Sequence, residues 1–229
     1  MKLILRAQKI VYRAIILFLV IGSLVMGCLH KGAASDCGLN GVETLDDVYN
    51  LPVVLDYAWD TSNVGMIGTD YGVDNATIIA LIKPTGHIKQ YENAISQEFI
   101  VTEVLRGEEG FSAGKTGYIF DYFGFSYISG QIKYMNTLNL MQTGEEYLAF
   151  LEPSPLNSYQ NISVYTLTSS LFGYIKVGPA ETGTLPSDYQ TLSFAELTDY
   201  AFFSVCPEIT EYLNQSYMDL LTTYVLMAQ

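Results

Sequence analysis

The pattern of hydrophobic positions changes twice along the chain. An uncharged apolar run, residues 14–29, follows a basic start. Between about residues 51 and 180, short apolar and β-branched runs recur between turn signals, which is typical of strands. Past residue 180 the apolar spacing becomes three and four residues, which is typical of helices. The pattern predicts four parts: a signal peptide or membrane anchor (1–29), a spacer (30–50), a β-barrel domain (51–180) and a C-terminal helical extension (181–229).

Seven short strands are predicted within residues 76–177. The first run ends at Pro84-Thr85-Gly86, a turn signature, and the fifth lies between Thr143-Gly144 and Pro153. We expect the last two runs to form a hairpin. Short repeated strands bury a shared face without open edges when they close on themselves, so the pattern favours a small antiparallel barrel. The expected strands are 76–83, 97–106, 116–125, 132–140, 147–152, 164–168 and 171–177.

Helix signals follow a loop rich in Gly and Pro at 178–188. Ser193-Phe-Ala-Glu196 is a capping box, and Pro207 suits the first turn of a further helix. The apolar face of that helix either packs on the barrel or docks a partner. It comprises Ile209, Tyr212, Leu213, Tyr217, Leu220, Leu221 and Tyr224.

The charge is uneven. Of the 11 basic residues, four precede Cys28, whereas all 24 acidic residues follow it, so the part from Cys28 onward has a net charge of −17. The basic start favours a cytoplasmic N-terminus and an exported domain at the outer face of the cell membrane. So acidic a domain repels phosphates, which argues against nucleic-acid binding and leaves cationic partners or simple solubility.

Val25-Met26-Gly27-Cys28 resembles the lipobox of bacterial lipoproteins, in which a small residue precedes a cysteine that becomes the lipidated N-terminus. Met26 departs from the usual residue at its position. We favour lipidation at Cys28, and an uncleaved N-terminal anchor or a released protein are the alternatives.

Cys37 and Cys206 are then the remaining cysteines. An exported compartment permits a disulfide between them. It would close a loop of about 170 residues and contribute on the order of 4 to 5 kcal/mol in the chain-entropy model. The alternative is a buried Cys206 and a free Cys37.

Two motifs carry a family resemblance. The runs VTEVLRG at 101–107 and GEEYLAFL at 144–151 resemble steps in exported bacterial proteins of unknown function. The cores of those proteins are similar to the oligonucleotide-binding (OB) type barrel of tissue inhibitors of metalloproteinases. Covering residues 76–177, the resemblance implies a mainly β, small antiparallel OB-like (NTR/TIMP-like) barrel with C-terminal helices. It does not extend to inhibition, because the inhibitors chelate zinc through an N-terminal disulfide-paired cysteine, a pattern that Cys28 and Cys37 do not reproduce.

Catalytic signatures are scarce. His30 and His87 are the only histidines, and no G-x-S-x-G elbow, H-E-x-x-H helix or phosphate-binding loop occurs. Acidic pairs occur at Asp46-Asp47, Glu108-Glu109 and Glu145-Glu146. We therefore predict neither an enzyme nor a bound metal or cofactor.

Residues 51–75 form the segment most suggestive of binding. They are aromatic, acidic and rich in Gly, and long loops on rigid scaffolds often carry function, although packing against the barrel is the simpler interpretation. A calcium site at 70–74 lacks the EF-hand spacing. The candidate binding residues are Tyr57, Trp59, Asp60, Asp70 and Tyr71.

The sequence thus favours a membrane-anchored, exported β-barrel module that binds another envelope protein. One alternative is a carbohydrate-active hydrolase with two carboxylates near Trp59. The other is a purely structural component of the cell envelope.

Overall fold

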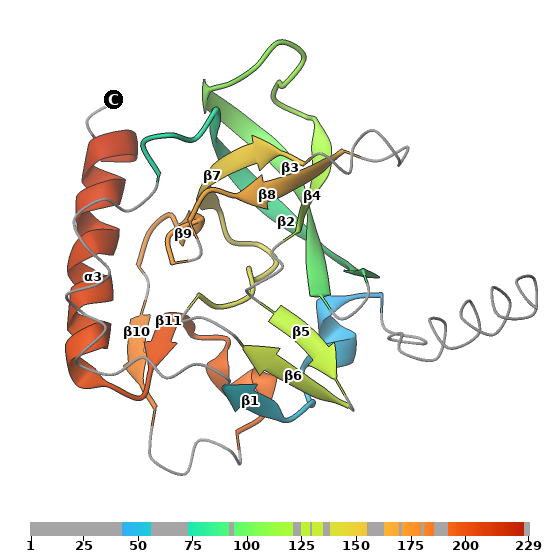
Figure 1. Ribbon diagram of the computed structural model, residues 1–229, viewed down its shortest axis with the longest axis vertical. Helices are drawn as coiled ribbons and strands as arrows, with labels where there is room; N and C mark the ends of the chain where they lie inside the picture. The colour runs from blue at the N-terminus through green and yellow to red at the C-terminus, as the bar shows by residue number, and fades with distance from the viewer. Residues whose placement is uncertain are drawn as a thin grey trace, which may run out of the picture. The chain divides into compact units, whose positions relative to one another are not determined.

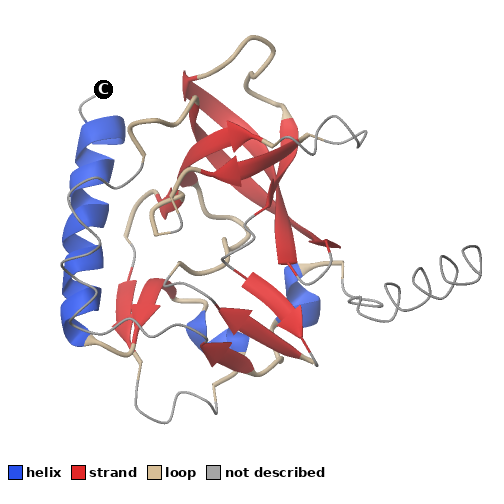
Figure 2. Cartoon of the chain, viewed as in Figure 1, coloured by secondary structure: helices blue, strands red, loops and turns tan. Residues whose placement is uncertain are grey.

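The computed structural model describes residues 43–55, 73–91, 94–120, 125–128, 130–134, 138–154, 163–169, 171–179, 181–185 and 192–226. They all belong to one unit, Gly41–Gln229. Strands dominate these residues, which contain a single α-helix (Figures 1 and 2). The prediction of a mainly β protein is confirmed.

Five strands close a ring of hydrogen-bonded neighbours. β2 pairs with β3 and β7, β3 also pairs with β4, and β7 also pairs with β8, all antiparallel. β8 then closes the ring against β4 in parallel, with Tyr118 opposite Val164. The expected antiparallel pairing is therefore found at four of the five contacts of the ring, and the fifth contact is parallel. The ring strands are β2 (Ile78–Tyr91), β3 (Ala94–Arg106), β4 (Thr116–Phe120), β7 (Tyr147–Pro153) and β8 (Val164–Leu167).

Large side chains fill the ring where a glycine leaves room. A Cβ on Gly117 would lie 2.6 Å from the Tyr165 ring and 3.1 Å from that of Phe99. Tyr165 also contacts Phe99 and Phe111, with ring centroids 5.7 and 5.5 Å apart. Phe99 and Tyr165 are both buried, so β4 and β8 come together over a packed aromatic cluster.

A second group of strands extends from β3. β5 (Phe125–Ile128) meets β3 at Ala94, β6 (Gln131–Tyr134) pairs with β5, and β1 (Val53–Leu55) pairs with β6 in parallel. Before β1, the 3-10 helix η1 (Leu45–Val48) buries Leu45 and Val48, so the end of the expected spacer packs into the folded unit.

The C-terminal part combines strands and helices. β10 (Glu181–Thr184) and β11 (Tyr200–Ser204) form a parallel two-stranded sheet, and α3 (Pro207–Leu221) packs beside both, as Figure 1 shows. The expected loop at 178–188 therefore contains a strand.

The predicted helix starts are confirmed. Ser193 and Glu196 form the capping box of the 3-10 helix η4 (Phe194–Leu197), and Pro207 opens α3. A π-helical turn, η5 (Thr222–Leu226), ends the described chain, and its Tyr224 ring packs on Phe150 at 5.2 Å. Within the described chain, no helix is long and apolar enough to cross a membrane.

Two predicted turns were wrong. Pro84-Thr85-Gly86 lies inside β2 as an irregularity, since Pro84 pairs with Phe99 and Ile88 with Gln97 on the same partner strand. Gly86 permits this because its φ of 90° suits glycine. The expected final hairpin does not form either. β8 and β9 (Tyr174–Lys176) both pair with β7, β8 at its C-terminal half and β9 at its N-terminal half, instead of pairing with each other.

Candidate functional site

A short segment, 138–142, which is buried as far as Met141, joins the ring to the C-terminal strands. Gln97 of β3 exchanges two hydrogen bonds with Met141: its Nε2 donates to the Met141 carbonyl at 2.9 Å and its Oε1 accepts from the Met141 amide at 2.8 Å. On the other side, Leu138 bridges to Phe202 of β11 and the Asn139 amide donates to the Ala201 carbonyl. These contacts fix the segment to β3 of the ring on one side and to β11 of the C-terminal part on the other.

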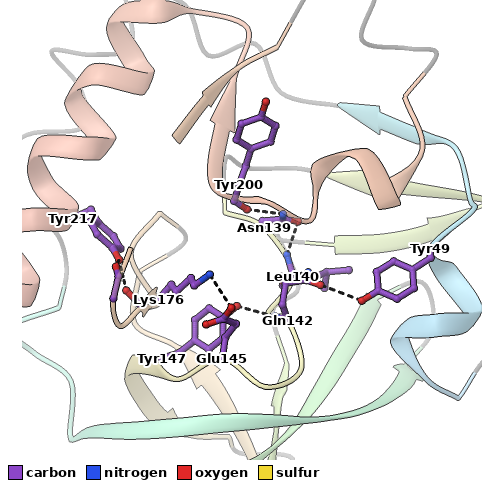
Figure 3. Close-up of polar contacts among 10 residues, drawn as sticks. Tyr49, Asn139, Leu140, Gln142, Glu145, Tyr147, Lys176, Tyr200 and Tyr217 are labelled. Carbon is purple, nitrogen blue, oxygen red and sulfur yellow. Dashed lines mark hydrogen bonds and ion pairs between the residues drawn. The ribbon is translucent and has the colours of Figure 1, made fainter. Parts of the chain in front are cut away.

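Asn139 uses its whole side-chain hydrogen-bonding capacity. Its Nδ2 donates to the carbonyls of Leu197 and Tyr200, each at 2.7 Å. Its Oδ1 accepts from the Tyr134 hydroxyl and the Leu140 amide, each at 2.8 Å. Because Asn139 is 2% exposed, these bonds form away from water and fix the position of the segment (Figure 3).

The chain reaches the surface at Gln142. The Gln142 amide donates to the Tyr147 hydroxyl at 2.8 Å, and its Oε1 accepts from the Tyr49 hydroxyl at 3.4 Å (Figure 3). Burial raises the pKa of Tyr147, and the nearby Glu145 carboxylate adds to the rise, although the bond from Gln142 opposes it. Tyr147 therefore stays a neutral acceptor that holds the loop.

A polar hollow of about 490 Å³ opens beside this loop. Lys176 at the end of β9 forms an ion pair with Glu145 at 3.0 Å, and the Lys176 side chain is 22% exposed. Asp199 is exposed, and within the described chain its carboxylate has no hydrogen-bonding or ionic partner. The hollow therefore has two carboxylates and one ammonium. Its lining is Tyr49, Gln142, Thr143, Glu145, Lys176, Pro179, Thr198 and Asp199.

An apolar hollow of about 420 Å³ adjoins it and shares Pro179. Its wall on α3 includes Met218, which is 47% exposed. Its other wall is the chain after β9, where Gly178 has a φ of 112° that suits glycine. The lining comprises Val177, Gly178, Pro179, Asn214, Tyr217, Met218, Leu221 and Val225.

Tyr217 joins the two walls of the apolar hollow. Its hydroxyl lies within hydrogen-bonding distance of the carbonyls of Lys176 and Gly178, the latter at 2.8 Å (Figure 3). Burial raises the pKa of Tyr217 to about 12, so the hydroxyl remains a donor at neutral pH. This contact attaches α3 to the end of β9, the element that also supplies Lys176 to the polar hollow.

A second polar cluster lies at the irregularity in β2. Glu98 accepts hydrogen bonds from the hydroxyls of Thr85 at 2.7 Å and Tyr118 at 2.8 Å, and the Lys89 ammonium lies 4.2 Å from the centre of the Tyr118 ring. Burial would raise the pKa of Glu98, but the two hydrogen bonds, with the charges of His87 and Lys89, lower it below its ordinary value. The cluster stabilises the irregular stretch of β2.

The candidate residues predicted from the sequence lie mostly outside the described residues. This holds for Tyr57, Trp59, Asp60, Asp70 and Tyr71, and also for Cys28 and Cys37. Cys206 is buried just before α3, forms no disulfide with another described residue, and its Sγ donates to the Glu208 carboxylate at 3.0 Å. Its bridge to Cys37 stays a prediction.

The acidic pair at 145–146 divides between different partners. Glu145 binds Lys176, whereas Glu146 accepts from the Thr102 hydroxyl at 2.8 Å and lies 3.8 Å from the Lys83 ammonium. In the part of the chain that the structure describes, no group of three or more His, Cys, Asp or Glu side chains is placed to hold a metal ion.

Sequence reasoning missed most of the residues around the two hollows. Glu145 was noted only as one of a pair, and Tyr217 only as part of an apolar face. Nothing local marks Lys176 or Asp199, because the hollows form from segments distant in sequence. Comparison with known proteins assigns no family: no family model matches the chain, and no curated protein matches it significantly.

Proposed function

We propose that this protein is an extracytoplasmic binding module, attached to the outer face of the cell membrane through its N-terminal segment, that holds another envelope protein. The observation that carries the proposal is the pair of adjoining hollows at Pro179, one apolar and one polar. Pockets for small ligands commonly combine an apolar lining with a few fixed polar groups and have volumes of about 300 to 1,000 Å³, so each hollow is large enough to take a side chain of a partner.

The scaffold supports a binding role. We interpret the ring as a small OB-type barrel, because its five strands follow a Greek-key order in which β8, the last of them in the chain, lies between β4 and β7. Such barrels serve many unrelated functions through sites placed around a rigid sheet. Here the two hollows lie where the 138–142 segment, β9 and α3 meet.

The polar groups of the site are arranged for holding a ligand in one orientation. The Glu145–Lys176 pair fixes two charged ends, and the Tyr217 hydroxyl fixes the chain that separates the hollows. These contacts restrict the side chains before any partner arrives, which lowers the entropic cost of binding.

Attachment at the membrane rests on the sequence of the first 28 residues. A basic start, an apolar run and Cys28 in a lipobox-like context support lipidation there. Cys28→Ala is expected to abolish incorporation of a labelled fatty acid into the protein, whereas Cys37→Ala, the matched control, is expected to leave the labelling unchanged. A native chain that stays in the membrane fraction without incorporating the label would favour an uncleaved anchor.

The binding role is tested by crosslinking the tagged full chain in intact cells of its own source and identifying captured proteins by mass spectrometry. A tagged lipoprotein of unrelated sequence is the control. We expect one envelope protein recovered in near-stoichiometric amount over that control. Recovery of nothing beyond the control would refute a stable protein partner and would turn attention to the hydrolase hypothesis near Trp59.

A further inference from the structure

We infer that the two hollows act as one recognition site for an extended segment of the partner protein. That segment places an apolar side chain beside α3 and a nearby lysine or arginine against Glu145 and Asp199. The inference rests on the proposed binding function and specifies the chemistry of the partner.

The apolar half has the features of a side-chain pocket. Val177, Pro179, Leu221 and Val225 line it, and Met218 stands at its rim, 47% exposed. Methionine is unbranched and polarizable, so it adapts to different apolar partners and is common at peptide-binding surfaces. A leucine or phenylalanine side chain entering this hollow would remove both its own surface and the Met218 side chain from water.

The polar half selects the charge of the partner. Lys176 is already paired with Glu145 at 3.0 Å. Of the three charged groups that line the polar hollow, the Asp199 carboxylate is therefore the one without a partner within the described chain. A basic side chain in the hollow would face Asp199 on one side and Glu145 on the other. An acidic side chain there would meet two carboxylates and compete for a lysine that is already engaged.

The net charge of the whole domain also favours a basic partner segment. The part of the chain from Cys28 onward has a net charge of −17, which attracts cationic segments and repels anionic ones over about one Debye length. Anionic lipid headgroups are repelled as well, so the charge favours a basic protein segment over the membrane surface as the occupant of the apolar hollow.

The apolar and polar hollows share one lining residue. Pro179 belongs to both hollows, so an apolar and a basic side chain close together on one segment can reach them simultaneously. In an extended segment, residues two apart point to the same side, about 7 Å from each other. The partner motif we expect is therefore an apolar residue and a basic residue two positions apart in the sequence.

The probe is an array of capped peptides in a Gly/Ser background. Each peptide contains one Leu, Phe or Met and one Arg, Lys or Glu, at separations of one to four residues. The full chain, purified in detergent, is applied to the array, and the strongest peptide is then titrated by fluorescence anisotropy at low and high salt. We expect apolar–basic peptides to bind about fivefold or more tightly than apolar–acidic peptides, with the difference shrinking at high salt.

Two variants locate the binding on the surface. Asn214→Trp places a ring over the apolar hollow and is expected to weaken binding about tenfold or more, because the ring takes the space of the partner's apolar side chain. Gln215→Trp is its control, since Gln215 is exposed on the same helix and does not line the hollow. Asp199→Lys is expected to weaken binding about fivefold, and Glu108→Lys, on an exposed turn, to leave it unchanged.

The peptide array tests which charge the site prefers, and the variants test whether the peptides bind at the two hollows. A preference for acidic peptides, no preference by charge, or equal effects of Asn214→Trp and Gln215→Trp would each overturn the inference. The same variants are then crosslinked in cells. If Asn214→Trp and Asp199→Lys still capture the envelope partner as the native chain does, the binding function stands and this site is not its interface. If the native chain itself captures none, the proposed function fails.

Discussion

Asn139 provides the most direct test of how the structure is held together. The perturbation is Asn139→Ala, which removes four hydrogen bonds while changing no surface feature, because Asn139 is 2% exposed. Each such bond contributes about 1 kcal/mol net. Four lost bonds, some leaving buried groups without partners, give an expected loss of about 3 to 5 kcal/mol in the free energy of unfolding.

A companion variant isolates one of the four bonds. Tyr134→Phe removes the hydroxyl that donates to Asn139 Oδ1 at 2.8 Å, with an expected loss of about 1 kcal/mol. In the Asn139→Ala background the same change should cost about 1 kcal/mol less, because this acceptor is already gone. The double-mutant cycle therefore yields a coupling energy of about 1 kcal/mol.

The assay is urea unfolding of the full chain followed by far-UV circular dichroism, with the free energy obtained from the midpoint and slope. A loss below about 1 kcal/mol for Asn139→Ala would refute the reasoning, since one ordinary hydrogen bond is already worth that much. Equal costs of Tyr134→Phe in both backgrounds would show that the Tyr134–Asn139 bond does not form in solution.

Three further predictions concern other sites. The pKa of Glu98 lies below its ordinary value of 4.5, so the ionised carboxylate stabilises the fold fully above that pH, and this contribution is lost as the pH falls through the lower folded pKa. In Glu98→Gln, the midpoint of urea unfolding should therefore fall less steeply as the pH is lowered below about 5. The same dependence of the midpoint on pH in the variant and the native chain would contradict this. Gly117→Ala forces a Cβ to within 2.6 Å of the buried Tyr165 ring and should cost about 1 to 3 kcal/mol in urea unfolding, whereas Thr116→Ala on the exposed face should cost little. Tyr217→Phe removes the hydroxyl between α3 and the end of β9 and should lower stability by about 1 to 2 kcal/mol while leaving the α-helical signal intact; no change in stability would show that those contacts are dispensable.

The sequence predicted best where local signals and packing agree. The β-branched run at 97–106 forms the C-terminal part of β3, and Ser193 with Glu196 caps η4 as expected. The Pro84-Thr85-Gly86 turn failed because the same residues also fit an irregular strand, and the long partner β3 supplies hydrogen bonds on both sides of the irregularity. Local turn chemistry could not reveal that a partner continues past the turn.

The hollows were beyond sequence reasoning for a different reason. Lys176, Asp199 and Met218 come from a strand end, a loop and a helix, and nothing in the spacing of the three indicates that they line two adjoining hollows. The two halves of the site depend on β9 pairing with β7 and not with β8, which the expected hairpin would have prevented. A site built from long-range pairings becomes visible only when those pairings are known.

Closure of the ring by a parallel pair has a consequence for how the protein folds. β4 and β8 cannot meet through a local turn: Tyr118 must wait until the chain as far as Val164 is available. The wall that α3 and η5 contribute to the apolar hollow comes later still, from residues between 214 and 225. A chain that emerges from its N-terminus during synthesis therefore leaves one edge of β4 unpaired until β8 (Val164–Leu167) has followed. The polar hollow needs the chain only as far as Asp199, but the apolar hollow beside it is complete only after Val225 has arrived. The proposed two-part site therefore forms only when α3 folds onto strands that are already in place.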